Sequence, residues 1–225
     1  MTRPAESEAS SGAGRVRVWD LPTRLFHWTL AVLVGFSFAS AKVGGALLDW
    51  HFYCGYTILA LVTFRLLWGF AGSRYARFAN FVRGPLAIAA YLRGGPARPG
   101  HNPLGALSVL AMLLCLLVQA STGLFATDDI ASEGPLAKLV SASTAALLTR
   151  IHRWNEKVLL TLTILHLGAV FYYLLAGRRN LIVPMLTGDQ QAYGAPAARD
   201  DPAMRLRAVV LLAVASGLVG YLVNL

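Results

Sequence analysis

Charged residues are scarce in this sequence. They make up 14% of the 225 residues, while 56% are hydrophobic, and a soluble domain usually has about 25% charged residues. Acids are rarer than bases, so the net charge is +9, which on its own would suggest a nucleic-acid partner. The basic residues, however, lie between long apolar runs, and this placement is typical of a membrane protein. We therefore expect membrane lipid around the chain and no nucleic acid as a partner.

Cysteine is also rare. Cys54 and Cys115 are the only two, and both lie inside apolar runs, which argues against a disulfide framework. The sequence has no CxxCH motif for covalent haem attachment. We expect no cleavable signal peptide, because the first apolar run comes late and is long. The polar residues 1–14 are predicted to form a disordered tail.

Five apolar runs predict an all-α membrane protein. The first two expected helices run from the Asp20 cap to Ala41 and from Trp50 to Gly72. The third starts at the Asn102 cap, with its uncharged part from Leu104 to Ala126, and the fourth runs from Thr144 to Gly177. The fifth apolar run is Ala208 to Leu225. Runs of this length can cross a bilayer. A short interfacial helix is expected over residues 85–92. The predicted fold is a four-helix transmembrane bundle over residues 15–190, followed by residues 191–225 as a linker and a fifth C-terminal transmembrane helix.

The distribution of charge predicts the orientation in the membrane. Arginines gather at the N-terminus, in residues 73–100 and in the segment between the fourth and fifth helices. The positive-inside rule places these three regions, and so the N-terminus, in the cytoplasm. The loop with Asp128, Asp129 and Glu133 then faces outward, where it could offer an acidic surface to a basic partner.

Four histidines are expected at two levels of the bundle. His152 and His166 are fourteen residues apart, which on a helix is about 21 Å of rise and within about 40° of the same face. The topology puts His51 at the depth of His152, and His27 roughly at the depth of His166. Two planar iron porphyrins fit this arrangement, each between two imidazoles, because a bundle core presents side chains from facing helices.

A metal site and a proton relay are the alternatives. A single interfacial histidine is usually a boundary residue, whereas burying His166 in lipid is costly without a purpose. A proton relay usually chains acids, and none is expected within the membrane. Zinc would need ligands that converge at one depth. The pattern therefore favours two haems, with the four histidines as cofactor and iron ligands.

Arg65 and His101 are two further candidates. Arg65 lies fourteen residues after His51, so it should lie near the level of the inner pair. An arginine at that depth needs an anionic partner, and a haem propionate would suit it; the alternative is that Arg65 snorkels to the cytoplasmic interface. His101 is interpreted as a loop histidine near a helix cap, with contact to a haem edge or a quinone as the alternative.

Several segments together resemble one family. These are WDLPTRLFHW at residues 19–28, RLLWGFAGSRYARF at 65–78, GHNPLG at 100–105 and the helix with His152 and His166. The combination resembles the bacterial cytochrome b-561 superfamily, which includes the membrane cytochrome subunit of nickel–iron hydrogenases. The resemblance covers about residues 15–190, and the fifth helix is an addition to the four-helix core, for packing or for partner docking.

The resemblance implies two b-type haems. Carried over by position, His27 and His166 would hold the cytoplasmic-side haem, and His51 and His152 the outer one. Members of the family pass electrons between the quinone pool of a respiratory chain and a partner protein, so a hydrogenase or a cytochrome c is expected as the partner in the bacterial inner membrane. The alternative is a stand-alone haem enzyme such as a superoxide:quinone oxidoreductase. The oligomeric state stays open, with a homodimer among the alternatives.

Overall fold

The computed structural model describes residues 14–95, 99–128, 132–192 and 194–225. The long helices are α1 (Leu21–Val43), α2 (Leu47–Ala71), α5 (Pro103–Gly123), α6 (Ala142–Leu175) and α8 (Pro202–Val223). Within the described ranges, these five helices are long and apolar enough to cross a membrane. This confirms the all-α membrane fold with a fifth C-terminal helix. The tail expected over residues 1–14 lies outside the described residues, apart from residue 14.

Three long helices begin with the same local chemistry. Asp20, Asn102 and Asp201 each accept the backbone N–H three residues later, at 2.7, 2.7 and 3.0 Å, and a proline follows in the first turn. Such a cap stabilises a helix start and proline is preorganised for it. The starts expected near Asp20 and Asn102 are confirmed. The fifth helix begins six residues before the apolar run that starts at Ala208, because Asp201 caps it there. The other expected bounds agree with the structure within three residues.

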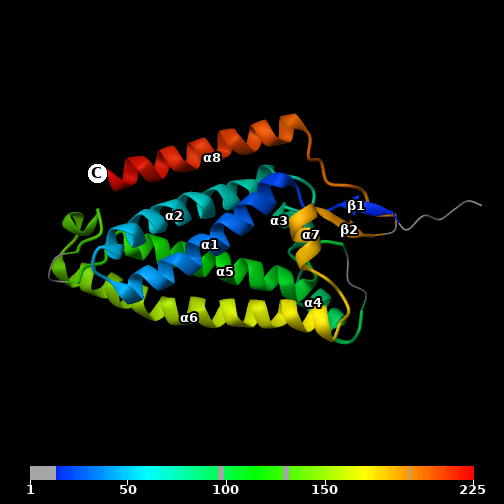
Figure 1. The fold of residues 1–225 in the computed structure, drawn as a ribbon, viewed down its shortest axis with the longest axis horizontal. Helices are drawn as coiled ribbons and strands as arrows, with labels where there is room; N and C mark the ends of the chain where they lie inside the picture. Colours follow the sequence, from blue (N-terminus) through cyan, green and yellow to red (C-terminus); the bar gives the residue numbers. More distant parts are fainter. Residues whose placement is uncertain (1–13, 96–98, 129–131, 193) are drawn as a thin grey trace, which may run out of the picture.

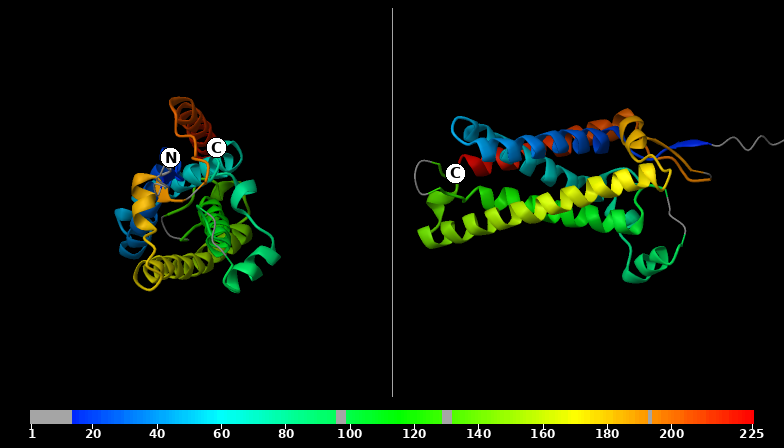
Figure 2. Two further views of the ribbon diagram at one scale, coloured as in Figure 1. Left: turned by 90° about the vertical axis from the view of Figure 1, so that its right-hand side faces the viewer. Right: turned by 60° about the horizontal axis from the view of Figure 1, so that its bottom comes forward.

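Two helical hairpins form the bundle (Figures 1 and 2). α1 packs along α2, α5 packs along α6, and α2 joins the hairpins by packing against α5. α2 is the central helix, since 56% of its most apolar stretch is buried, against 6% for α6. Its Val62 and Trp68 side chains are fully buried. The long exposed apolar faces of the other helices are what a lipid environment requires.

α8 lies outside the four-helix bundle and packs mainly along α2 (Figure 1). Its buried residues are Met204, Ala208, Ala215 and Val219. They fall on one side of the helix, and the two alanines let the backbones approach closely, as small residues do between membrane helices. The fifth helix therefore packs on the bundle.

Short elements gather at the end of the bundle opposite the α1–α2 turn (Figure 1). They are β1 (Arg15–Arg17), α3 (Phe78–Phe81), α4 (Pro85–Leu92), α7 (Ile182–Thr187) and β2 (Asp189–Gln191), while η1 (Ala137–Leu139) lies in the α5–α6 connection. The bounds of α4 are those expected for the interfacial helix. β1 pairs with β2 in antiparallel register, so the two ends of the bundle domain meet in one small sheet.

One carboxylate joins three segments at this end. Asp200, whose side chain is 8% exposed, accepts hydrogen bonds from Arg17 at 2.9 Å, from the Leu21 amide at 3.2 Å and from Arg205 at 3.3 Å. Charge-assisted hydrogen bonds of this kind are the strong ones. Asp200 thus holds the starts of α1 and α8 against β1.

Candidate functional site

His27 and His166 form the first histidine pair, here called the sheet-side pair because it lies toward β1 and β2. His27 comes from α1, two turns after its cap, and His166 from α6. Their ring centroids are 6.4 Å apart and the rings are inclined by 57°. His27 Nδ1 is buried and has no hydrogen-bond partner among the described residues. The pair therefore bridges the two hairpins with its ring nitrogens largely unused.

His51 and His152 form the second pair, called the turn-side pair because it lies toward the α1–α2 turn. His51 comes from α2 and His152 from α6, and their ring centroids are 6.3 Å apart. His51 Nδ1 lies 3.0 Å from the Ser37 carbonyl oxygen, and His152 Nδ1 lies 2.9 Å from the Gln119 carbonyl oxygen. A ring held in this way by Nδ1 presents Nε2 to a ligand.

Both separations leave room for one metal ion between two rings. A metal–imidazole bond is about 2 Å long, and the centre of an imidazole lies about 1 Å beyond its nitrogen, so two rings that share one ion have centroids roughly 6 Å apart. No group of three or more histidine, cysteine or acidic side chains that could hold a metal occurs among the described residues. The arrangement suits two axial ligands on a cofactor and does not suit a zinc cage built from side chains.

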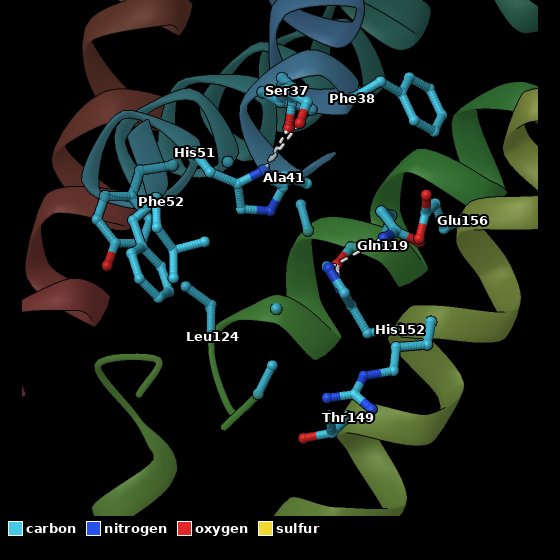
Figure 3. A pocket seen from close by; sticks show the side chains of 18 of the residues that line it. Ser37, Phe38, Ala41, His51, Phe52, Gln119, Leu124, Thr149, His152 and Glu156 are labelled. Carbon is cyan, nitrogen blue, oxygen red and sulfur yellow. Dashed lines mark hydrogen bonds between the residues drawn. The ribbon is translucent and has the colours of Figure 1, made fainter. Parts of the chain in front are cut away.

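A cavity of about 360 Å³ surrounds the turn-side pair (Figure 3). His51 and His152 point into it from opposite walls, and its volume falls in the usual range of about 300–1,000 Å³ for small-molecule and cofactor sites. Gly55 also lines it, and a Cβ atom added there would meet no atom within 4 Å. A glycine inside a helix costs about 1 kcal/mol relative to alanine, and no neighbouring side chain explains it here. Gly55 thus leaves space for something that enters the cavity.

Sequence reasoning missed the amides beside the turn-side pair. Asn155 donates to the Gln119 side-chain oxygen at 2.7 Å and to the Cys115 carbonyl oxygen at 2.9 Å. The Gln119 amide nitrogen in turn lies 3.1 Å from His152 Nε2. The available signal was Gln119, a lone amide in an otherwise apolar helix, because such a group needs a partner when buried.

Arg65 lies inside the protein, on α2. Its residue is 3% exposed, and its guanidinium carbon lies 5.2 Å from the Phe78 ring centroid and 6.0 Å from that of Phe81. The Nη1 atom has no hydrogen-bond partner among the described residues. The alternative in which Arg65 snorkels to the interface was therefore wrong, and a buried guanidinium with a free donor remains.

His101 lies in the loop directly before the Asn102 cap of α5, as predicted, and its ring is packed against aromatic side chains. Its ring lies 4.7 Å from Trp19 and 4.6 Å from Phe81, centroid to centroid. Burial, reinforced by the nearby Arg65 charge, lowers the pKa of His101 to about 3. Its surroundings are the second feature that sequence reasoning missed, because Trp19 and Phe81 come from two segments that are far from His101 in the sequence.

Spanning helices that face histidines toward one another in pairs across their bundle define the class of membrane cytochromes of the b type. A family described as prokaryotic cytochrome b561 matches residues 18–188. The chain belongs to this family, which confirms the resemblance seen in its motifs. It is accordingly a multi-pass bacterial membrane protein that binds b-type haem and takes part in electron transfer. No curated protein and no solved structure matches the chain.

Proposed function

We propose that this protein is a two-haem electron carrier that passes electrons between the quinone pool and a partner redox protein. One b-type haem is held by the sheet-side pair and the other by the turn-side pair. Bound haem supplies one-electron chemistry, while the protein supplies axial ligands, orientation and local charge. The observation that carries the proposal is the ring separation of 6.4 and 6.3 Å in two pairs drawn from three helices.

The surroundings of the pairs support the proposal. Tethering of Nδ1 in His51 and His152 to backbone carbonyl oxygens frees Nε2 for iron and fixes the plane of each ring. The Gln119 amide faces the same Nε2 of His152, so its side chain must rotate away when iron binds. At the other level, the unpartnered Nη1 of Arg65 suits a haem propionate, because guanidinium and carboxylate form strong charge-assisted hydrogen bonds.

The charges at the two ends support an orientation with the sheet-side haem toward the cytoplasm. The described arginines on segments at the sheet end are Arg15, Arg17, Arg24, Arg74, Arg77, Arg83, Arg93, Arg178, Arg179, Arg199, Arg205 and Arg207. The turn end has fewer bases, and cytoplasmic segments carry the excess of arginine and lysine in bacterial membrane proteins. The N-terminus is then cytoplasmic in the inner membrane, and the partner on the turn side is a periplasmic redox protein.

The spectrum of the purified protein tests the haem count. We expect a b-type α band after reduction with dithionite and two haems per chain by pyridine haemochrome. His27→Ala and His166→Ala should each abolish the same haem, and His51→Ala and His152→Ala the other. If His27→Ala and His152→Ala abolished one common haem, the pairing would be wrong, and a folded colourless protein would exclude the proposal.

A stand-alone superoxide:quinone oxidoreductase is the second candidate. An anionic substrate needs a cation beside a reachable haem, and Arg153 lines the cavity at the turn-side pair. Lys42 is less available, because it pairs with Glu156 at 2.9 Å. If this candidate is right, enzymatically generated superoxide reduces the haems rapidly, and Arg153→Gln slows the reaction while the matched Arg150→Gln does not. Reduction by a quinol or a partner protein alone would exclude it.

A further inference from the structure

A third imidazole lies beside the sheet-side pair. His101 precedes α5 and packs between Trp19 and Phe81. Its Nδ1 atom is shielded from solvent and has no hydrogen-bond partner in the part of the chain that the structure describes. Buried polar atoms of this kind are nearly always paired in native proteins, because leaving one unpaired costs free energy. A group that the protein itself does not supply is therefore expected at this nitrogen.

Phe81 lies close to both His101 and Arg65. The Phe81 ring centroid lies 4.6 Å from the His101 ring centroid and 6.0 Å from the guanidinium carbon of Arg65. Arg65 Nη1 and His101 Nδ1 both lack partners among the described residues, as does Arg24 Nε. Arg24 stands three residues before His27 on α1, so it shares a face with that ligand candidate. The unpaired nitrogens of Arg65 and His101 thus belong to side chains that contact the same ring.

The missing partner of Arg65 must be an acceptor, and one with negative charge suits it best. A guanidinium has only donors, and a neutral imidazole has one N–H to give. Burial and the nearby Arg65 charge lower the pKa of His101, and in one of its two neutral tautomers the ring donates through Nδ1. The buried carboxylate of Asp20 accepts from the Thr23 amide at 2.7 Å and from Trp68 Nε1 at 3.2 Å, and it is not a hydrogen-bond partner of Arg65 Nη1 or His101 Nδ1.

We propose that His101, with Arg65, binds a propionate carboxylate of the haem held by the sheet-side pair. This inference rests on the proposed two-haem function. A propionate is an anionic acceptor that reaches out from the edge of the haem, and it meets the requirement of both side chains. His101 is then a cofactor-binding residue whose N–H partly neutralises the propionate charge and so favours the reduced haem.

Two substitutions separate hydrogen bonding from packing. His101→Phe keeps a ring between Trp19 and Phe81 but removes the N–H, whereas His101→Gln keeps an N–H donor. In His101→Phe, the reduced-to-oxidised ratio of the sheet-side haem at a fixed potential should fall by about three- to tenfold, which for a one-electron couple is about 30–60 mV. In His101→Gln the ratio should stay within about twofold of the wild type, and the turn-side haem should not change in either variant.

Infrared spectroscopy measures the propionate carboxylate band, which a change in packing alone does not shift. Haem labelled with ¹³C at its propionate carboxyls is incorporated in cells, and redox-difference spectra of the whole protein are recorded. A propionate band should shift in His101→Phe, and by less in His101→Gln, while the packing control Trp19→Phe leaves it in place. If His101→Phe does not fold, His101→Gln alone is measured: a shifted propionate band supports the contact, and an unshifted band contradicts it.

The outcomes distinguish this inference from the function on which it rests. A folded protein without haem would overturn the proposed function itself. Two bound haems, together with a propionate band and midpoint potentials that neither His101 variant moves, would overturn only the role of His101 and leave it as a packing residue.

Discussion

Asp20 offers the sharpest test of how the sheet end of the bundle is held together. This fully buried carboxylate caps α1 through the Thr23 amide and also accepts from Trp68 Nε1 on α2. Asp20→Ala removes the cap, at a cost of about 1 kcal/mol, and leaves the fully buried Trp68 N–H unpaired, at about 1–3 kcal/mol. We therefore expect the free energy of unfolding to fall by about 2–4 kcal/mol. Asp20→Ala also removes a negative charge near the buried Arg65, and this loss lowers the free energy of unfolding further.

Thermal unfolding in detergent, followed by circular dichroism, measures this loss. One kcal/mol corresponds to about 2–4 °C for a chain of this size, so Tm should fall by roughly 4–16 °C. Asp20→Asn keeps an oxygen for the cap but offers Trp68 no acceptor in its place, so its Tm should lie between those of the wild type and Asp20→Ala. The matched control is Asp201→Ala, which removes the cap of α8 without a buried indole partner, and it should lower Tm by less than Asp20→Ala.

Haem absorbance during the same experiment connects stability with the site. α1 carries His27 two turns after Asp20, whereas neither histidine of the turn-side pair lies on α1. In Asp20→Ala the haem of the sheet-side pair should therefore be lost at a lower temperature than the haem of the turn-side pair. Equal losses of Tm in Asp20→Ala and Asp201→Ala would refute the role of the Trp68 contact, and simultaneous loss of both haems would refute its local effect.

Three other expectations follow from single contacts. Arg65→Leu should lower the midpoint potential of the sheet-side haem by roughly 70 mV, because a unit charge acting over about 10 Å at an effective dielectric of about 20 is worth roughly 1.7 kcal/mol; redox titration with an unchanged value would contradict this. Gly55→Leu should abolish the turn-side haem in the pyridine haemochrome count by filling the cavity, whereas Gly217→Leu, which also has open space around its Cβ but lies on α8, should retain it. Lys42→Met should change Tm by less than about 4 °C, because a surface ion pair such as Lys42–Glu156 is worth at most about 1 kcal/mol. A larger fall in Tm would mean that this ion pair holds the two hairpins together.

The sequence predicts the parts of the fold that depend on local chemistry. Cap and proline signals gave the starts of α1 and α5, and apolar run lengths gave five spans. The fourteen-residue spacing of His152 and His166 predicted that both lie on one face of one helix. This prediction needs only the helical period. The ligand role of these histidines remains a prediction.

Contacts between distant segments could not be predicted in the same way. The pairing of β1 with β2, the hydrogen bond from Trp68 to Asp20 and the enclosure of His101 by Trp19 and Phe81 join residues far apart along the chain. Helical periodicity indicates which face of a helix is apolar but does not say which residue of another element will meet it. The same limit applies to Gln119 and Asn155, because their hydrogen bonds depend on how α5 packs against α6.

Each histidine pair takes one ring from α6. The stretch of α6 between His152 and His166 contains neither glycine nor proline, the residues at which sharp kinks usually arise. In the proposed two-haem protein, this unbroken helix would therefore largely set the distance between the two cofactors. A movement of α1 or α2 relative to α6 would then change the geometry at one cofactor more than the spacing between the two.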